Sequence, residues 1–143
     1  MTGSTNLAPR PLVNTRHDDG VLILTINCES FSGWRAEEIA SICLGYANPE
    51  MGGHSRQAVS LGLVREITCE GLRALVQVSD SLSAEGGKLI VFGAPQDVRS
   101  IVRRTGLRLT LTRQGTREAV RLARSGDDVA YRLRLPFARR NAA

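Results

Sequence analysis

Short continuous runs of mostly aliphatic residues occur at three places in this chain, 21–26, 58–63 and 88–93. Such runs are typical of strands that are buried on both faces of a sheet. The Asp-Asp-Gly sequence at 18–20, just before the first run, is a strong turn signal. Residues 12–16 are therefore expected to form a hairpin with that run, and the three runs are expected to form the centre of a sheet.

Between these runs, apolar residues recur every three or four positions, which is the spacing of one helix face. This spacing predicts helices over 34–46, 72–84 and 116–124. A further helix is expected to start with Pro95 at its first helical position and to end at the break at 105–107. Strands that alternate with helices of this length imply crossover connections and a mostly parallel sheet.

Leucine alternates with polar side chains over 107–112, which predicts a half-exposed edge strand. The expected architecture is a single α/β domain over residues 12–125, with a mixed four- to five-stranded sheet and about four helices. Residues 1–11 are polar and contain Pro9 and Pro11, so they are expected to form a disordered arm. Residues 126–143 form a basic tail whose period-two alternation is consistent with an extra strand or with a disordered arm.

Composition narrows the class of protein. Hydrophobic residues make up 42% of the 143 residues and charged residues 23%, which suits one soluble domain with a sizeable core. No apolar run approaches the ~18 residues of a membrane span, and the first residues lack the apolar stretch of a signal peptide. We therefore expect a cytoplasmic protein.

The formal net charge of +5 comes almost entirely from arginine, since Lys88 is the only lysine. The positive charge is spread over the second half of the chain, which is typical of a solvated surface. Arg99, Arg103 and Arg104 lie on one expected helix and would form either a basic patch or a solvated face. An aromatic content of 4% argues against a stacking platform for nucleic acid. A basic nucleic-acid-binding protein remains an alternative interpretation.

The cysteines and histidines show no metal-site or disulfide spacing. Cys28, Cys43 and Cys69 are widely separated, which fits a reducing compartment. His17 and His54 are far apart in the sequence and are expected in loops. A structural zinc site would need four suitably spaced ligands, and the sequence has neither a phosphate-binding loop nor a nucleophile elbow. We expect no metal, no cofactor and no enzyme activity.

Several segments, taken in order, resemble those of one known family. They are the strand at 21–26 followed by Glu29, the sequence Ile-Thr-Cys-Glu-Gly-Leu at 67–72, the helix, Gly-Gly turn and strand at 72–93, and the helix and Thr-Gly-Leu turn at 95–107. Together they resemble the STAS domain of anti-sigma factor antagonists. The resemblance implies a regulatory protein-binding module whose partner is an anti-sigma factor or a histidine-kinase-like ATPase. It would also suit a scaffold subunit of a stressosome or of a lipid-transport ABC complex.

The resemblance points to one turn as the functional site. In that family, a serine at a helix start is phosphorylated by an anti-sigma kinase, and the unmodified form binds that kinase. Here Cys69 stands at the serine position, between Thr68 in place of an aspartate and Glu70 in place of a second serine. Phe31 stands where an earlier turn usually has an aspartate. The partner-binding surface implied by the resemblance consists of Thr68, Cys69, Glu70, Gly71, Leu72, Arg73, Glu29 and Phe31.

Three interpretations of this turn remain open. In the first, Cys69 is a small structural residue and the module binds without a switch. In the second, Thr68 or a nearby serine takes a phosphate at the helix start. In the third, Cys69 is redox-sensitive, because a helix N-terminus favours the thiolate. Thr68 also suits the helix N-cap, where its hydroxyl would accept a backbone N–H. Trp34 is either a partner anchor or a core residue.

Overall fold

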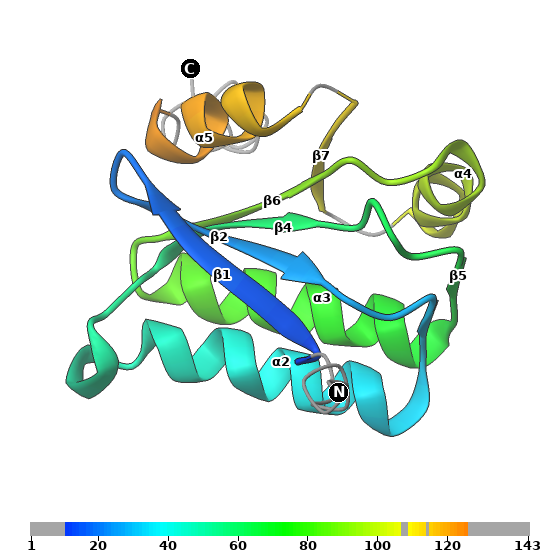
Figure 1. Ribbon diagram of the computed structural model, residues 1–143, viewed down its shortest axis with the longest axis horizontal. Helices are drawn as coiled ribbons and strands as arrows, with labels where there is room; N and C mark the ends of the chain where they lie inside the picture. The colour runs from blue at the N-terminus through cyan, green and yellow to red at the C-terminus, as the bar shows by residue number, and fades with distance from the viewer. Residues whose placement is uncertain (1–10, 107–108, 114, 126–143) are drawn as a thin grey trace, which may run out of the picture.

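The computed structural model of the protein describes residues 11–106, 109–113 and 115–125. Residues 1–10 of the expected arm, and the whole expected tail at 126–143, lie outside the described residues. The described residues form a central sheet with helices on both faces (Figure 1).

The central sheet has five strands in the order β1-β2-β4-β6-β7. They are β1 (Val13–Asp18), β2 (Val21–Ile26), β4 (Arg56–Ser60), β6 (Lys88–Phe92) and β7 (Thr110–Thr112). β1 pairs antiparallel with β2, and the other neighbours are parallel. β6 is buried along its whole length and β2 along nearly all of it, because aliphatic runs at the centre of a sheet are covered on both faces.

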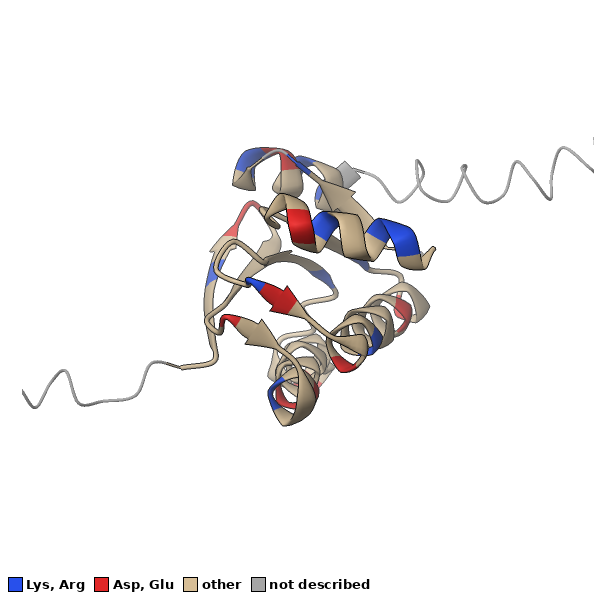
Figure 2. Ribbon diagram, turned by 90° about the vertical axis from the view of Figure 1, so that its right-hand side faces the viewer, with Lys and Arg blue, Asp and Glu red and all other residues tan. Residues whose placement is uncertain are grey.

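Four α-helices occur among the described residues, α2 (Gly33–Ala47), α3 (Cys69–Ala84), α4 (Gln96–Thr105) and α5 (Thr116–Ser125). A short 3₁₀ turn, η1 (Pro49–Met51), follows α2. α2 and α3 lie side by side on one face of the sheet, and α5 covers the other (Figures 1 and 2). None of the helices in the described ranges is both long and apolar enough to cross a membrane.

Alternation along β2 distributes its side chains between two apolar clusters. Leu22 and Leu24 belong to the larger cluster, which also contains the buried faces of α2 and α3. Val21 and Ile23 belong to the smaller cluster, which packs against Ala119 and its neighbours on α5. Successive residues of a strand point to opposite faces, so one aliphatic run supplies both clusters.

A second, two-stranded sheet consists of β3 (Ser30–Phe31) and β5 (Glu66–Ile67). The two strands are parallel, with Phe31 opposite Ile67. Each is only two residues long, too short to show a hydrophobic period, and the sequence pattern did not predict them. This small sheet lies beside the start of α3 (Figure 1).

The structure confirms the expected α/β fold, with a mixed five-stranded sheet and four helices over the described residues. Some boundaries differ. β4 ends at Ser60, because the Leu61 carbonyl accepts the Val64 N–H and turns the chain. Pro95 is the N-cap of α4 and not its first residue, because its ψ of 159° is extended. His17 lies within β1 and not in a loop.

Candidate functional site

Backbone hydrogen bonds attach the turn before α3 to the segment before α2. The N–H groups of Arg65 and Glu66 both donate to the Glu29 carbonyl, at 2.7 and 3.0 Å. The Thr68 N–H donates to the Phe31 carbonyl at 3.3 Å. These bonds extend the pairing of β3 with β5 on both sides. The start of α3 is therefore held at a fixed position beside the chain that leads into α2.

Gly71 allows α3 to come this close. A Cβ atom at this position would lie 2.3 Å from the Phe31 carbonyl oxygen and 2.8 Å from the Ile67 side chain. Both distances are far shorter than van der Waals contact, and one of the atoms belongs to the backbone, which cannot rotate away. The glycine expected at the partner surface is thus a buried packing residue.

Glu70 lies where two helix starts meet. Its carboxylate accepts the Thr68 hydroxyl, with 2.7 Å between Oγ1 and Oε1. That hydrogen bond lowers the pKa of Glu70 most, with further lowering from its own backbone N–H, the charge of Arg73 and the Gly33 N–H. Gly33 is the first residue of α2. The positive ends of two helix dipoles therefore converge on one carboxylate.

Thr68 is the N-cap residue of α3, but its side chain does not cap the helix. The sequence analysis expected its hydroxyl to accept a backbone N–H. The hydroxyl instead donates to Glu70, because an ionised carboxylate is a strong hydrogen-bond acceptor. The expected side-chain cap at Thr68 is therefore wrong.

The residues expected at the binding surface divide into exposed and buried sets. Glu29, Cys69, Glu70 and Arg73 are exposed, and Thr68 is half-buried. The buried members are Phe31, Gly71 and Leu72. Phe31 is 0% exposed and belongs to the main apolar cluster, so its side chain supports the turn from beneath and does not face a partner.

Trp34 stands on the surface at the first turn of α2. Its side chain is 65% exposed, and the Arg35 guanidinium lies over its ring at 5.2 Å from the centroid. The sequence left open whether this tryptophan packs in the core, and the structure shows that it does not. It follows Gly33, whose backbone N–H contributes to the lowered pKa of Glu70, so Trp34 extends the exposed set to the start of α2.

The three cysteines are all free thiols. Burial raises the pKa of Cys43 to about 12. Burial also raises the pKa of Cys28, against a smaller opposite effect of the nearby charge of Arg35. Cys69 is exposed at the first position of α3. Cys69 is the most exposed of the three thiols, since Cys28 is half-buried and Cys43 is buried.

Glu70 should give the fold a measurable acid response. Its folded pKa lies below the ordinary value of 4.5, so its stabilising effect is present above pH 4.5 and is lost as pH falls through the folded pKa. As the pH falls through that range, the thermal midpoint of Glu70→Gln should fall less steeply than that of the wild type. Circular dichroism melts between neutral pH and about pH 3 measure this.

The control for this measurement is Glu37→Gln, which removes one exposed carboxylate from α2. It should keep the wild-type slope. Identical acid slopes for the wild type and Glu70→Gln would show that the interactions of Glu70 do not stabilise the fold.

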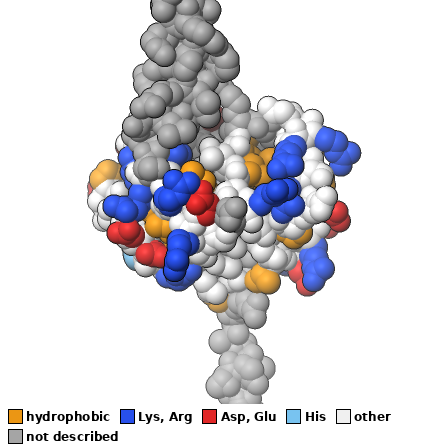
Figure 3. Space-filling model, turned by 90° about the horizontal axis from the view of Figure 1, so that it is seen from above, with side chains coloured by type: hydrophobic (Ala, Val, Ile, Leu, Met, Phe, Trp, Pro, Cys, Tyr) orange, Lys and Arg blue, Asp and Glu red, His pale blue; other side chains and the backbone are white. Residues whose placement is uncertain are grey.

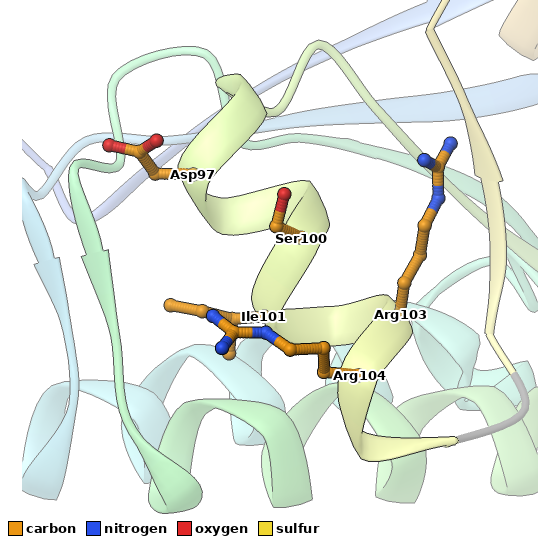
Figure 4. Close-up of a pocket in the computed structure, with 5 residues that line it drawn as sticks. All are labelled: Asp97, Ser100, Ile101, Arg103 and Arg104. Atoms are coloured by element: carbon orange, nitrogen blue, oxygen red, sulfur yellow. The ribbon is translucent and has the colours of Figure 1, made fainter.

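The arginines of α4 do not form a single basic patch. Arg99 Nη1 donates to the Ala94 carbonyl at 2.8 Å, and its Nε atom is buried. Arg103 and Arg104 extend to different sides of the helix (Figure 4). The open hollow beside them, of about 610 Å³, is lined by Asp97, Ser100, Ile101, Arg103 and Arg104.

Arginines also gather around α5, but acidic side chains stand among them (Figures 2 and 3). Arg124 pairs with Asp19 at 2.9 Å, and Arg121 pairs with Glu118. Exposed pairs of this kind contribute little to stability, yet they reduce the field that would attract a nucleic-acid backbone. This face therefore does not favour the nucleic-acid interpretation.

No sequence profile of a known family matches the chain. No curated protein matches it either. Solved structures do resemble it. TM1081 of Thermotoga maritima, described as a candidate anti-sigma factor antagonist, is 20% identical, with a TM-score of 0.68 over 78% of this chain and 94% of that chain.

Two further structures have similar scores. The anti-sigma factor antagonist SpoIIAA in its unphosphorylated form is 10% identical, with a TM-score of 0.62 over 80% of this chain and 99% of that chain. The murine anion transporter Slc26a9 is 15% identical, with a TM-score of 0.63 over 78% of this chain and 19% of that chain. At these identities the likeness establishes the fold. The chain has the STAS-like fold of anti-sigma factor antagonists.

Proposed function

We propose that this protein is a regulatory binding module, and not an enzyme, whose partner is an anti-sigma factor of the histidine-kinase-like ATPase class. The partner would bind the helix-start surface, which we define as Glu29, Trp34, Cys69, Glu70 and Arg73. The observation that carries the proposal is the exposure of these side chains around the starts of α2 and α3, which buried residues hold close together. The fold, shared with anti-sigma factor antagonists, supports a role in binding an anti-sigma factor.

The chemistry of this surface suits a specific protein interface. A large exposed aromatic ring supplies the anchor, since tryptophan and arginine dominate the energetic centres of interfaces. Glu70 and Arg73 place opposite charges beside it on one helix turn, which selects the orientation of a partner. The backbone bonds to Glu29 and Phe31 order the turn before binding, so little entropy is lost on association.

The module is proposed to bind without a phosphorylation switch. Cys69 presents a thiol at the position that the resemblance assigns to a phosphorylated serine. Thr68, the other candidate, donates its hydroxyl to Glu70. A phosphate on Thr68 would add about −1.5 to −2 charges against that carboxylate. It would also stand at the same helix start as the Glu70 carboxylate, whose pKa its own backbone N–H already lowers.

Trp34→Ala should abolish most of the binding while leaving the fold intact. We expect the wild-type chain, carrying a small affinity tag, to capture a histidine-kinase-like ATPase from its own cells, identified by mass spectrometry. With the purified ATPase, Trp34→Ala should bind roughly 30-fold more weakly, the loss typical of an interface centre. Calorimetric titration measures the affinity, and phosphopeptide mapping of the complex should find Thr68 unmodified.

Met51→Ala is the matched control, because Met51 is also an exposed apolar side chain, 62% exposed, but follows the opposite end of α2. It should bind like the wild type. Equal affinities for Trp34→Ala and Met51→Ala would remove the helix-start surface from the proposal. Capture of a partner of another class would remove the anti-sigma factor.

A scaffold role is the second candidate function. The same fold occurs within the much longer chain of Slc26a9, so it also serves as one part of a larger protein. In this role the chain would be a scaffold subunit of a stressosome or of a lipid-transport ABC complex. Capture of transporter subunits, or of a large assembly of related domains, in the same pull-down would favour this role.

A further inference from the structure

The fold brings together the two histidines of the chain, which lie 37 residues apart in sequence. His17 is on β1, and its backbone is fixed opposite Leu22 of β2. His54 follows η1 and leads into β4. Their Nε2 atoms are 3.5 Å apart, and the ring centroids are 4.7 Å apart, with the rings tilted. His17 is exposed and His54 is half-buried, so solvent reaches the pair.

The separation of the two Nε2 atoms can be compared with the distances of hydrogen bonds and of metal ligands. The 3.5 Å contact is longer than the usual ~2.7–3.2 Å of an N–H···O hydrogen bond, so it is a weak hydrogen bond at most. Two imidazole nitrogens bound to one zinc ion at about 2.0–2.1 Å, with a tetrahedral angle between them, stand about 3.3–3.4 Å apart. The observed 3.5 Å is close to this second value. Each histidine thus presents the nitrogen that commonly binds a metal, at the spacing of two adjacent ligands.

Both imidazoles are carried by ordered backbone. The His54 N–H donates to the Tyr46 carbonyl at 2.8 Å, and the loop before it is closed by the bond from Gly53 N–H to the Asn48 carbonyl at 2.9 Å. Gly52 lies against the ring, since a Cβ atom there would stand 2.7 Å from His54 Nε2. A side chain at Gly52 would therefore crowd this nitrogen.

We propose that His17 and His54 form a two-histidine site for a divalent transition-metal ion that prefers imidazole, such as Zn²⁺. The described residues contain no group of three or more His, Cys, Asp and Glu side chains that could hold a metal. Water would therefore fill the remaining positions around the ion. A bound ion would link β1 to the loop between α2 and β4 and stabilise this end of the sheet, on the left in Figure 1.

The test is a titration of the untagged full-length chain with ZnCl₂, followed by calorimetry. The expected result is one ion per chain in the wild type, no heat with MgCl₂, and a higher thermal midpoint when Zn²⁺ is present. His17→Asn and His54→Asn should each weaken Zn²⁺ binding by about 10-fold or more. Neither change removes a core side chain, and circular dichroism in the absence of metal checks that each variant is folded.

Cys69→Ser is the control, because an exposed thiol is the other accessible soft ligand. It should bind Zn²⁺ like the wild type. Full affinity in both histidine variants, or loss of binding in Cys69→Ser, would overturn the proposal. So would a wild-type chain that takes up no Zn²⁺.

Discussion

Replacing Gly71 by alanine is expected to lower the free energy of unfolding by about 3 kcal/mol, at the upper end of the usual cost of overpacking. The added Cβ would meet the Phe31 carbonyl oxygen at 2.3 Å and the Ile67 side chain at 2.8 Å. Relief requires α3 to move away from β3. That movement would lengthen the bond from the Thr68 N–H to the Phe31 carbonyl, already 3.3 Å long. The helix start would then lose the position on which the proposed binding surface depends.

Gly45→Ala is the matched control, because the substitution is identical and the site is also helical. Gly45 lies within α2, and a Cβ atom there meets nothing within 4 Å. Alanine has the higher helix propensity, so this variant should be stabilised by about 0.5–1 kcal/mol. Urea denaturation measures both variants, with an unchanged slope as the check that only stability has changed. Two variants of similar stability would refute the close approach at Gly71.

The central sheet was predictable because its signal is local. The run Val21–Ile26 is aliphatic at every position except Thr25, and such a run would not be stable on the surface. β6 carries the same signal. The helices were equally clear from their apolar spacing, and Gly86 and Gly106, both at positive φ, end α3 and α4 where the sequence indicated. Each of these features depends on residues that are neighbours in sequence.

The features that were missed depend on contacts between distant segments. β3 and β5 consist of two residues each and exist only because they pair with one another. Phe31 was expected at the surface because the resemblance assigns that position to a turn, whereas packing places its ring in the core. Only the register of β1 with β2, together with the turn after α2, brings His17 to His54. A local sequence pattern cannot show which distant residues come into contact.

The resemblance placed this turn at a helix start, but it did not describe the contacts that the turn makes. Thr68, Cys69 and Glu70 do lie at the start of α3, as expected. The bond between the Thr68 hydroxyl and Glu70 was not anticipated. Nor was the approach of the α2 start, which brings Gly33 to the same carboxylate and Trp34 to the same surface. Where its residues differ from the family pattern, this chain forms interactions that the pattern does not contain.

Phe31→Ala should be the second severe change, with a loss of about 3–5 kcal/mol in the free energy of unfolding. The ring is fully buried, so its removal loses the free energy gained by burying the ring and leaves a cavity. The cavity would open beneath the turn that holds Thr68, and we expect partner binding to fall together with stability. Phe31→Leu keeps most of the volume and should cost less, about 1 kcal/mol.

Comparison of Phe31→Leu with Trp34→Ala distinguishes a residue that supports the binding surface from a residue that contacts the partner. Phe31→Leu should be measurably less stable in urea, yet bind the partner with nearly wild-type affinity under conditions where it is folded. Trp34→Ala should show the reverse, because its side chain is 65% exposed and its loss costs the fold little. If Phe31→Leu lost binding while it remained fully folded, the Phe31 side chain would have to reach the partner. That would require the turn between β3 and α2 to open on binding.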